Sequence, residues 1–188
     1  ARCELGDSGG LEELRDSLRI AIERGLTQEA NIGFNNYGNW LWLSEGAGAA
    51  LPVYRDGIAF NERRGRLVLW HRAELTWPLF DAGHWDEILE IAHLIEDETS
   101  GQAGQPLLMA LASKGRLLAY RGRTNEAEAI ARELLPQARI VRDPQILLPT
   151  LSLAALVESS ADGALAIVEE MVEVDAPDNP LYPDSARV

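Results

Sequence analysis

The chain has 188 residues, of which 46% are hydrophobic and 25% are charged, values typical of a folded globular protein. Its 17 basic and 30 acidic residues give a net charge of −13, and the largest basic cluster is Arg63-Arg64-Gly65-Arg66, so nucleic-acid binding by this segment is not expected. A single cysteine, Cys3, the lack of a secretory signal sequence and the lack of an apolar run of about 18 residues together predict a cytoplasmic protein without a membrane span.

Apolar residues recur at helical spacing along the chain, and no segment shows the alternation expected of a β-strand. The spacing predicts the end of a helix at 1–5, followed by helices at 8–24, 28–45, 48–64, 66–82, 85–98, 104–121, 124–141, 145–159 and 162–174. Residues 175–183 are predicted to form a linker into a further helix that the chain end cuts off.

An internal repeat with a period of 37 to 39 residues runs through these predicted helices. Its marker is a small or apolar residue early in every second helix: Leu11, Ala50, Ile88, Ala127 and Ala164. Such a period fits a helix–turn–helix unit slightly longer than the tetratricopeptide repeat of about 34 residues. We therefore predict an all-α fold, a right-handed solenoid of antiparallel helix pairs, forming one domain over residues 1–188 that is truncated at both ends.

Helix ends also carry recognisable residues. A glycine is expected to end the first helix of each unit, since glycine adopts the left-handed conformation without strain. Polar residues are expected to cap the second helix, the candidates being Asp7, Thr124 and Asp162. Pro52 and Pro144 suit the first turn of a helix, where the missing N–H is harmless.

Three segments, Ala30–Gly46, Tyr54–Gly65 and Leu118–Pro136, carry a resemblance to a known family. The chain resembles the C-terminal tetratricopeptide-like region of large bacterial signalling ATPases, especially those linked to adenylate or guanylate cyclases or to transcriptional regulators. The resemblance implies a nucleotide-binding module upstream in the full protein. This chain itself lacks the G-x-x-x-x-G-K-[ST] phosphate loop, because its only lysine, Lys114, follows Ala-Ser and precedes Gly without such a motif.

Residues able to support catalysis or metal binding do not occur in the required patterns. His71, His84 and His93 are too far apart to form a helical metal-binding pair. Cys3 lies at the chain start, and adjacent carboxylates such as Asp86 and Glu87 fit solvated helix faces. We therefore expect no catalytic, cofactor or metal site, and we do not expect an enzyme.

Tryptophan is the one enriched residue type, and four of the five, Trp40, Trp42, Trp70 and Trp77, lie on predicted first helices. The resemblance implies that first helices line a concave groove. We predict a groove site formed by Asn36, Tyr37, Trp40, Trp70, Glu74 and Trp77. The alternative is that the indole rings fill space between helices, which is the commoner role of large aromatics.

The function predicted from these features is a helical-repeat scaffold that binds a protein, a peptide or a small effector. It would be the sensor segment of a multidomain signalling ATPase. Two alternatives remain open: a helical segment of an enzyme, such as a nucleotide cyclase, whose catalytic domain lies elsewhere, and a free-standing peptide-binding adaptor.

Overall fold

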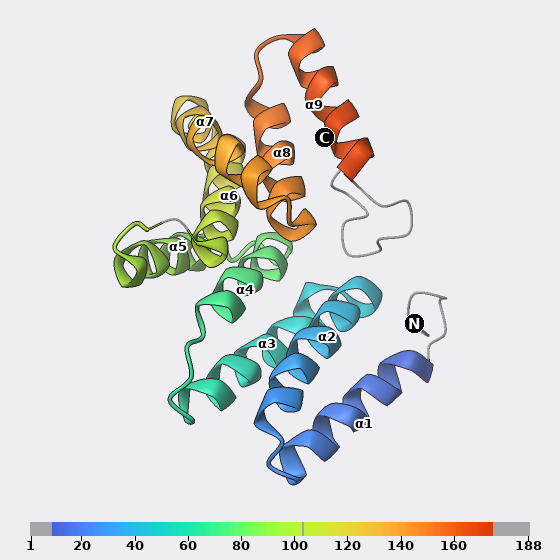
Figure 1. The fold of residues 1–188 in the computed structure, drawn as a ribbon. Helices are drawn as coiled ribbons and strands as arrows, with labels where there is room; N and C mark the ends of the chain where they lie inside the picture. Colours follow the sequence, from blue (N-terminus) through green and yellow to red (C-terminus); the bar gives the residue numbers. More distant parts are fainter. Residues whose placement is uncertain (1–8, 103, 175–188) are drawn as a thin grey trace. The chain divides into compact units, whose positions relative to one another are not determined.

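The computed structural model describes residues 9–102 and 104–174, and every regular element within them is a helix (Figure 1). The helices are α1 (Gly9–Glu23), α2 (Thr27–Glu45), α3 (Ala47–Glu62), α4 (Leu69–Asp81), α5 (Trp85–Thr99), α6 (Gln105–Tyr120), α7 (Thr124–Val141), α8 (Pro144–Val157) and α9 (Ala161–Val174). The predicted all-α class is confirmed, and each predicted helix from 8–24 to 162–174 corresponds to one of them. The predicted helix end at 1–5 and the linker at 175–183 lie outside the described residues.

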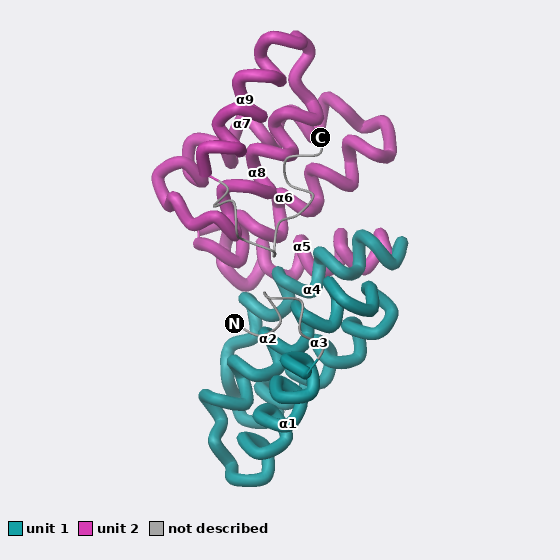
Figure 2. Tube along the Cα trace, turned by 90° about the vertical axis from the view of Figure 1, so that its right-hand side faces the viewer, with its two compact units in different colours: residues 1–83 teal, residues 84–188 magenta. Residues whose placement is uncertain are grey.

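The chain divides into two compact units, one containing α1 to α4 and the other α5 to α9 (Figure 2). Within unit 1, each helix packs against the next along the chain. The same holds in unit 2, where α6 also packs against α8.

Glycines follow the even-numbered helices α2, α4 and α6, as the sequence predicts, but α8 departs from the prediction because its C-cap is Glu158. Gly46, Gly83 and Gly122 follow these helices with φ values of 89°, 75° and 75°. A residue with a Cβ would be strained at these angles, so glycine sets where each helix stops. The marker residues that follow, Ala50 and Ile88 among them, are fully buried.

The predicted helix caps at Thr124 and Asp162 are wrong. Thr124 is already the first residue of α7, and no side chain caps that helix at its preceding residue. At α9, the cap is Ser160. Its hydroxyl accepts a hydrogen bond from the N–H of Gly163, three residues later, at 3.1 Å. Asp7 lies outside the described residues.

Proline positions follow the helix starts. Asp143 caps α8 by accepting a hydrogen bond from the Gln145 N–H at 2.9 Å, and Pro144 occupies the first helical position as predicted. Pro52 is further into α3 than predicted, because α3 begins at Ala47 and its first turn ends before the proline.

In unit 1, α2 and α3 approach closely through two reciprocal pairs of a glycine and an aromatic ring. A Cβ added at Gly57 of α3 would lie 2.9 Å from the Cβ of Phe34 on α2. A Cβ added at Gly38 of α2 would lie 3.1 Å from the ring of Tyr54 on α3. A side chain at Gly57 would force a shift of α2 or α3, whereas one at Gly38 would be in tight contact with the Tyr54 ring.

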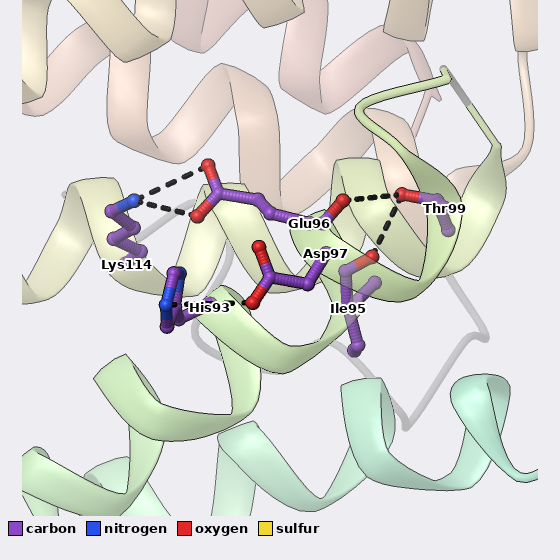
Figure 3. A network of polar contacts seen from close by, with 6 residues as sticks. All are labelled: His93, Ile95, Glu96, Asp97, Thr99 and Lys114. Carbon is purple, nitrogen blue, oxygen red and sulfur yellow. Dashed lines mark hydrogen bonds and ion pairs between the residues drawn. The ribbon is translucent and has the colours of Figure 1, made fainter.

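Unit 2 is organised around α6, which is buried against α5, α7 and α8 (Figure 1). Leu118, Ala127 and Leu153 belong to one buried cluster contributed by α6, α7 and α8. An ion pair ties α6 to α5, because Lys114 Nζ lies 3.0 and 3.3 Å from the two carboxylate oxygens of Glu96 (Figure 3).

Candidate functional site

The most unusual chemistry in the described chain is a row of polar side chains between α2 and α4, here called the α2–α4 seam. It comprises the Asn35 side chain and the Asn31 backbone of α2 with the side chains of Trp70, His71 and Glu74 of α4. The side chains of Trp70 and Asn35 donate hydrogen bonds to the Glu74 carboxyl group. The backbone of Asn31 interacts with the His71 ring.

Helical spacing explains why these residues meet. Asn31 and Asn35 are four residues apart and therefore share one face of α2. Trp70 and Glu74 are likewise four apart on α4, with His71 three residues before Glu74. Asn35 and Glu74 therefore meet through their side chains, whereas Asn31 meets the His71 ring through its backbone.

Glu74 is a buried carboxyl group. No charged side chain contributes to the shift of its pKa. Its relative exposure is 1%, and burial raises its pKa from 4.5 to about 7. The hydrogen bonds from Trp70 and Asn35 offset part of that effect, because they stabilise the ionised form. Near neutral pH, a large share of Glu74 is therefore protonated.

His71 is the second titratable group of the seam, and its exposure is 6%. Burial lowers its pKa, the Asn31 backbone partly opposes that effect, and the positive charge of Arg66 lowers the pKa further. Neither ring nitrogen has a hydrogen-bond partner of good geometry among the described residues. The imidazole is consequently held neutral at pH 7.

Side-chain contacts continue beyond the seam toward both ends of the two helices. The Trp42 ring of α2 stacks on the Trp77 ring of α4 with centroids 6.4 Å apart, and the Trp42 indole N–H donates to Asp81 at 2.8 Å. At the other end, Arg66 donates to Gln28 at 3.5 Å. Contacts therefore join α2 to the segment 66–81, which contains α4 and the residues just before it.

The six residues of the predicted groove occupy different environments. Trp70 and Glu74 are hydrogen-bonded to each other, with Glu74 inside the seam. Trp77 is half-buried against Trp42. Tyr37 packs against a hydrophobic cluster of α1, α2 and α3, and Trp40 is half-buried.

Of the six, Asn36 alone is classed as exposed. Its neighbour Asn35 is the residue that reaches Glu74, so the sequence-based selection named the adjacent asparagine. Asn35, His71 and Trp42 were not selected. The signal that could have found Asn35 is the four-residue spacing of Asn31, Asn35 and Asn39, which marks a polar stripe on one helix face.

The remaining histidines make local pairs with carboxylates. His84 Nδ1 lies 3.8 Å from Glu87, and His93 Nε2 lies 3.5 Å from Asp97 (Figure 3). In the described part of the chain, no three metal-binding side chains gather in one place. Across the same residues, no helix is long and apolar enough to span a bilayer. Cys3 is not among them.

Comparison with known proteins does not assign the chain to a family. A scan against protein-family models gives no matching family, and neither the curated proteins nor the solved structures contain a match to the chain.

Proposed function

We propose that this chain is a tetratricopeptide-like helical-repeat scaffold in a cytoplasmic regulator, and that its even-numbered helices bind a protein, a peptide or a small effector. In this proposal the array is the sensor segment of a multidomain signalling ATPase, whose nucleotide-binding module lies outside this segment. Its role is recognition, and the attached module supplies the chemistry.

The observation that carries the proposal is a recurring offset between contacting residues. The Gln28–Arg66 contact joins α2 to the connection just before α4 across 38 positions, and the Trp42–Asp81 contact joins α2 to α4 across 39. In unit 2, Gln105 at the start of α6 donates to Asp143 at the start of α8, again across 38 positions. Contacts at one repeat length between alternate helices are what stacked helix pairs produce.

Burial of Glu74 favours recognition over catalysis as the role of unit 1. A carboxyl group with a raised pKa is a frequent mark of an active site. A general acid must nevertheless reach its substrate, and only 1% of Glu74 is accessible. The hydrogen bond that Glu74 accepts from Asn35 links α4 to α2, which is a structural use of the group.

Site-specific photo-crosslinking tests the proposal. A photoreactive residue at Asn36, which is exposed on α2, should give a discrete covalent adduct with a partner in extracts of the source cells. The matched control is the same residue at Asp56, which is exposed on the odd-numbered helix α3. An adduct from position 36 and none from position 56 is expected. Equal adducts from both positions, or none from position 36, would contradict the proposal.

A further inference from the structure

Two polar atoms without hydrogen-bond partners lie on side chains that are already bonded to each other. Asn35 donates a side-chain hydrogen bond to the Glu74 carboxyl group. The amide oxygen Oδ1 of Asn35 and the carboxyl oxygen Oε2 of Glu74 are both buried and have no partner. A buried polar atom left without a partner loses its hydrogen bonds to water and gains none in return, so this pair requires an explanation.

A single proton would remove both deficiencies. Oδ1 of an amide and Oε2 of a carboxylate are both acceptors, so they cannot bond to each other. When Oε2 carries a proton, it becomes a donor and can bond to Oδ1 of Asn35. The Nδ2–H of Asn35 meanwhile continues to donate to the carboxyl group of Glu74. The result is a cyclic acid–amide pair with two hydrogen bonds and no net charge.

The protonation equilibrium of Glu74 is set by burial and hydrogen bonding, and not by charged groups near the seam. On α2 and α3, the titratable side chains are exposed except for Tyr37, which is half-buried, and Tyr54, which donates to Asn39; the exposed ones are Glu29, Glu45, Arg55, Asp56 and Glu62. On α4, Arg72 pairs with Glu62 at 2.7 Å. His71 is held neutral beside Arg66. No charged side chain contributes to the raised pKa of Glu74.

We propose that Glu74 is a proton-operated switch: when protonated it forms a cyclic acid–amide pair with Asn35 that holds α4 on α2, and when it loses the proton the pair breaks and the seam opens. The switch rests on the contacts of the seam and does not require the scaffold proposal. Its working range is centred near neutral pH, because burial raises the pKa of Glu74 to about 7.

Carboxyl-carbon NMR of the full chain tests the first half of the proposal. The Glu74 carboxyl resonance, assigned by its loss in Glu74→Gln, should titrate near pH 7, well above the ordinary 4.5. The indole N–H resonance of Trp70 should shift over the same range, because that group donates to Glu74. Titration of Glu74 below pH 5 would overturn the proposal.

Hydrogen exchange tests the second half. If Glu74 has a pKa of about 7 in the closed seam and 4.5 in the open one, linkage predicts that opening becomes about 70-fold more favourable between pH 5 and pH 8. Protection factors of α4 amides in the wild type should fall by about that factor relative to Glu74→Gln. The glutamine amide can form the same two hydrogen bonds with Asn35 but cannot titrate.

Glu45→Gln is the matched control, because Glu45 is an exposed glutamate at the end of α2. It should retain the wild-type pH dependence of α4 protection. Amides of α7 in unit 2 should show no difference between the wild type and Glu74→Gln. An equal pH dependence of α4 protection in the wild type and in Glu74→Gln would refute the switch.

Discussion

Substitution of Gly57 by alanine offers a quantitative test of the α2–α3 packing. A new Cβ at this position would lie 2.9 Å from Cβ and 3.0 Å from Cγ of Phe34. Because the Cβ of Phe34 is attached to the backbone, it cannot rotate away, and α2 must move by a few tenths of an ångström. Overpacking of this kind costs about 1–3 kcal/mol, whereas alanine gains about 1 kcal/mol over glycine in helix propensity. We expect a net destabilisation of about 1 kcal/mol.

Gly48→Ala is the control on the same helix, because a Cβ at Gly48 meets nothing within 4 Å. It should stabilise unit 1 by about 0.5–1 kcal/mol. Urea unfolding followed by tryptophan fluorescence in a Trp85→Phe background measures both variants, since the other four tryptophans all belong to unit 1. If Gly57→Ala proved as stable as Gly48→Ala, the close approach of α2 and α3 would be refuted.

Four further predictions address the titration of Glu74, the titration of His71, the repeat length and the capping of α8. Because the folded-state pKa of Glu74 is raised, the stabilising contribution of this group is lost as pH rises toward and through 7. Between pH 5 and pH 8, the free energy of unfolding of the wild type should therefore fall by about 2–3 kcal/mol relative to that of Glu74→Gln, as measured by urea titration. His71 has the opposite sign, so in Glu74→Gln the stability should rise as pH increases from 5 toward 6.5. Deletion of residues 124–160 places Ala164 where Ala127 was and should leave a cooperative thermal transition by circular dichroism, whereas deletion of residues 124–143 alone should abolish it. Asp143→Ala removes the α8 cap and should lower stability by about 1 kcal/mol in urea titrations, while Asp143→Asn should retain most of it.

Helix positions could be predicted closely because their determinants are local. Apolar spacing and the glycines at 46, 83 and 122 specify where chains turn, and the structure places helix ends there. The largest error is the start of α4, predicted at residue 66 and observed at Leu69. Gly65 has a positive φ of 66°, and the three residues that follow it are not helical. Local patterns do not reveal how long such a connection remains irregular.

The α2–α4 seam could not be predicted from the sequence of either helix alone. Glu74 lies among apolar neighbours on α4, and its burial depends on Asn35, which is on another helix. The period predicted from the sequence contains the missing information, since Asn35 and Glu74 are separated by the same offset as Trp42 and Asp81. Applying that offset to every polar residue of α2 would have paired Asn35 with Glu74. Whether a carboxyl group is ionised still requires the three-dimensional environment.

The chain contains one lysine, and its position has a practical consequence. Lys114 is the sole side-chain amine, and its ammonium group is held between the carboxylate oxygens of Glu96 at 3.0 and 3.3 Å. Acylation of this amine would remove its charge and free Glu96, so the modification would detach a link between α5 and α6. The rate at which an amine-directed reagent modifies Lys114 would therefore report how often the Lys114–Glu96 ion pair opens, with no engineered label in the protein.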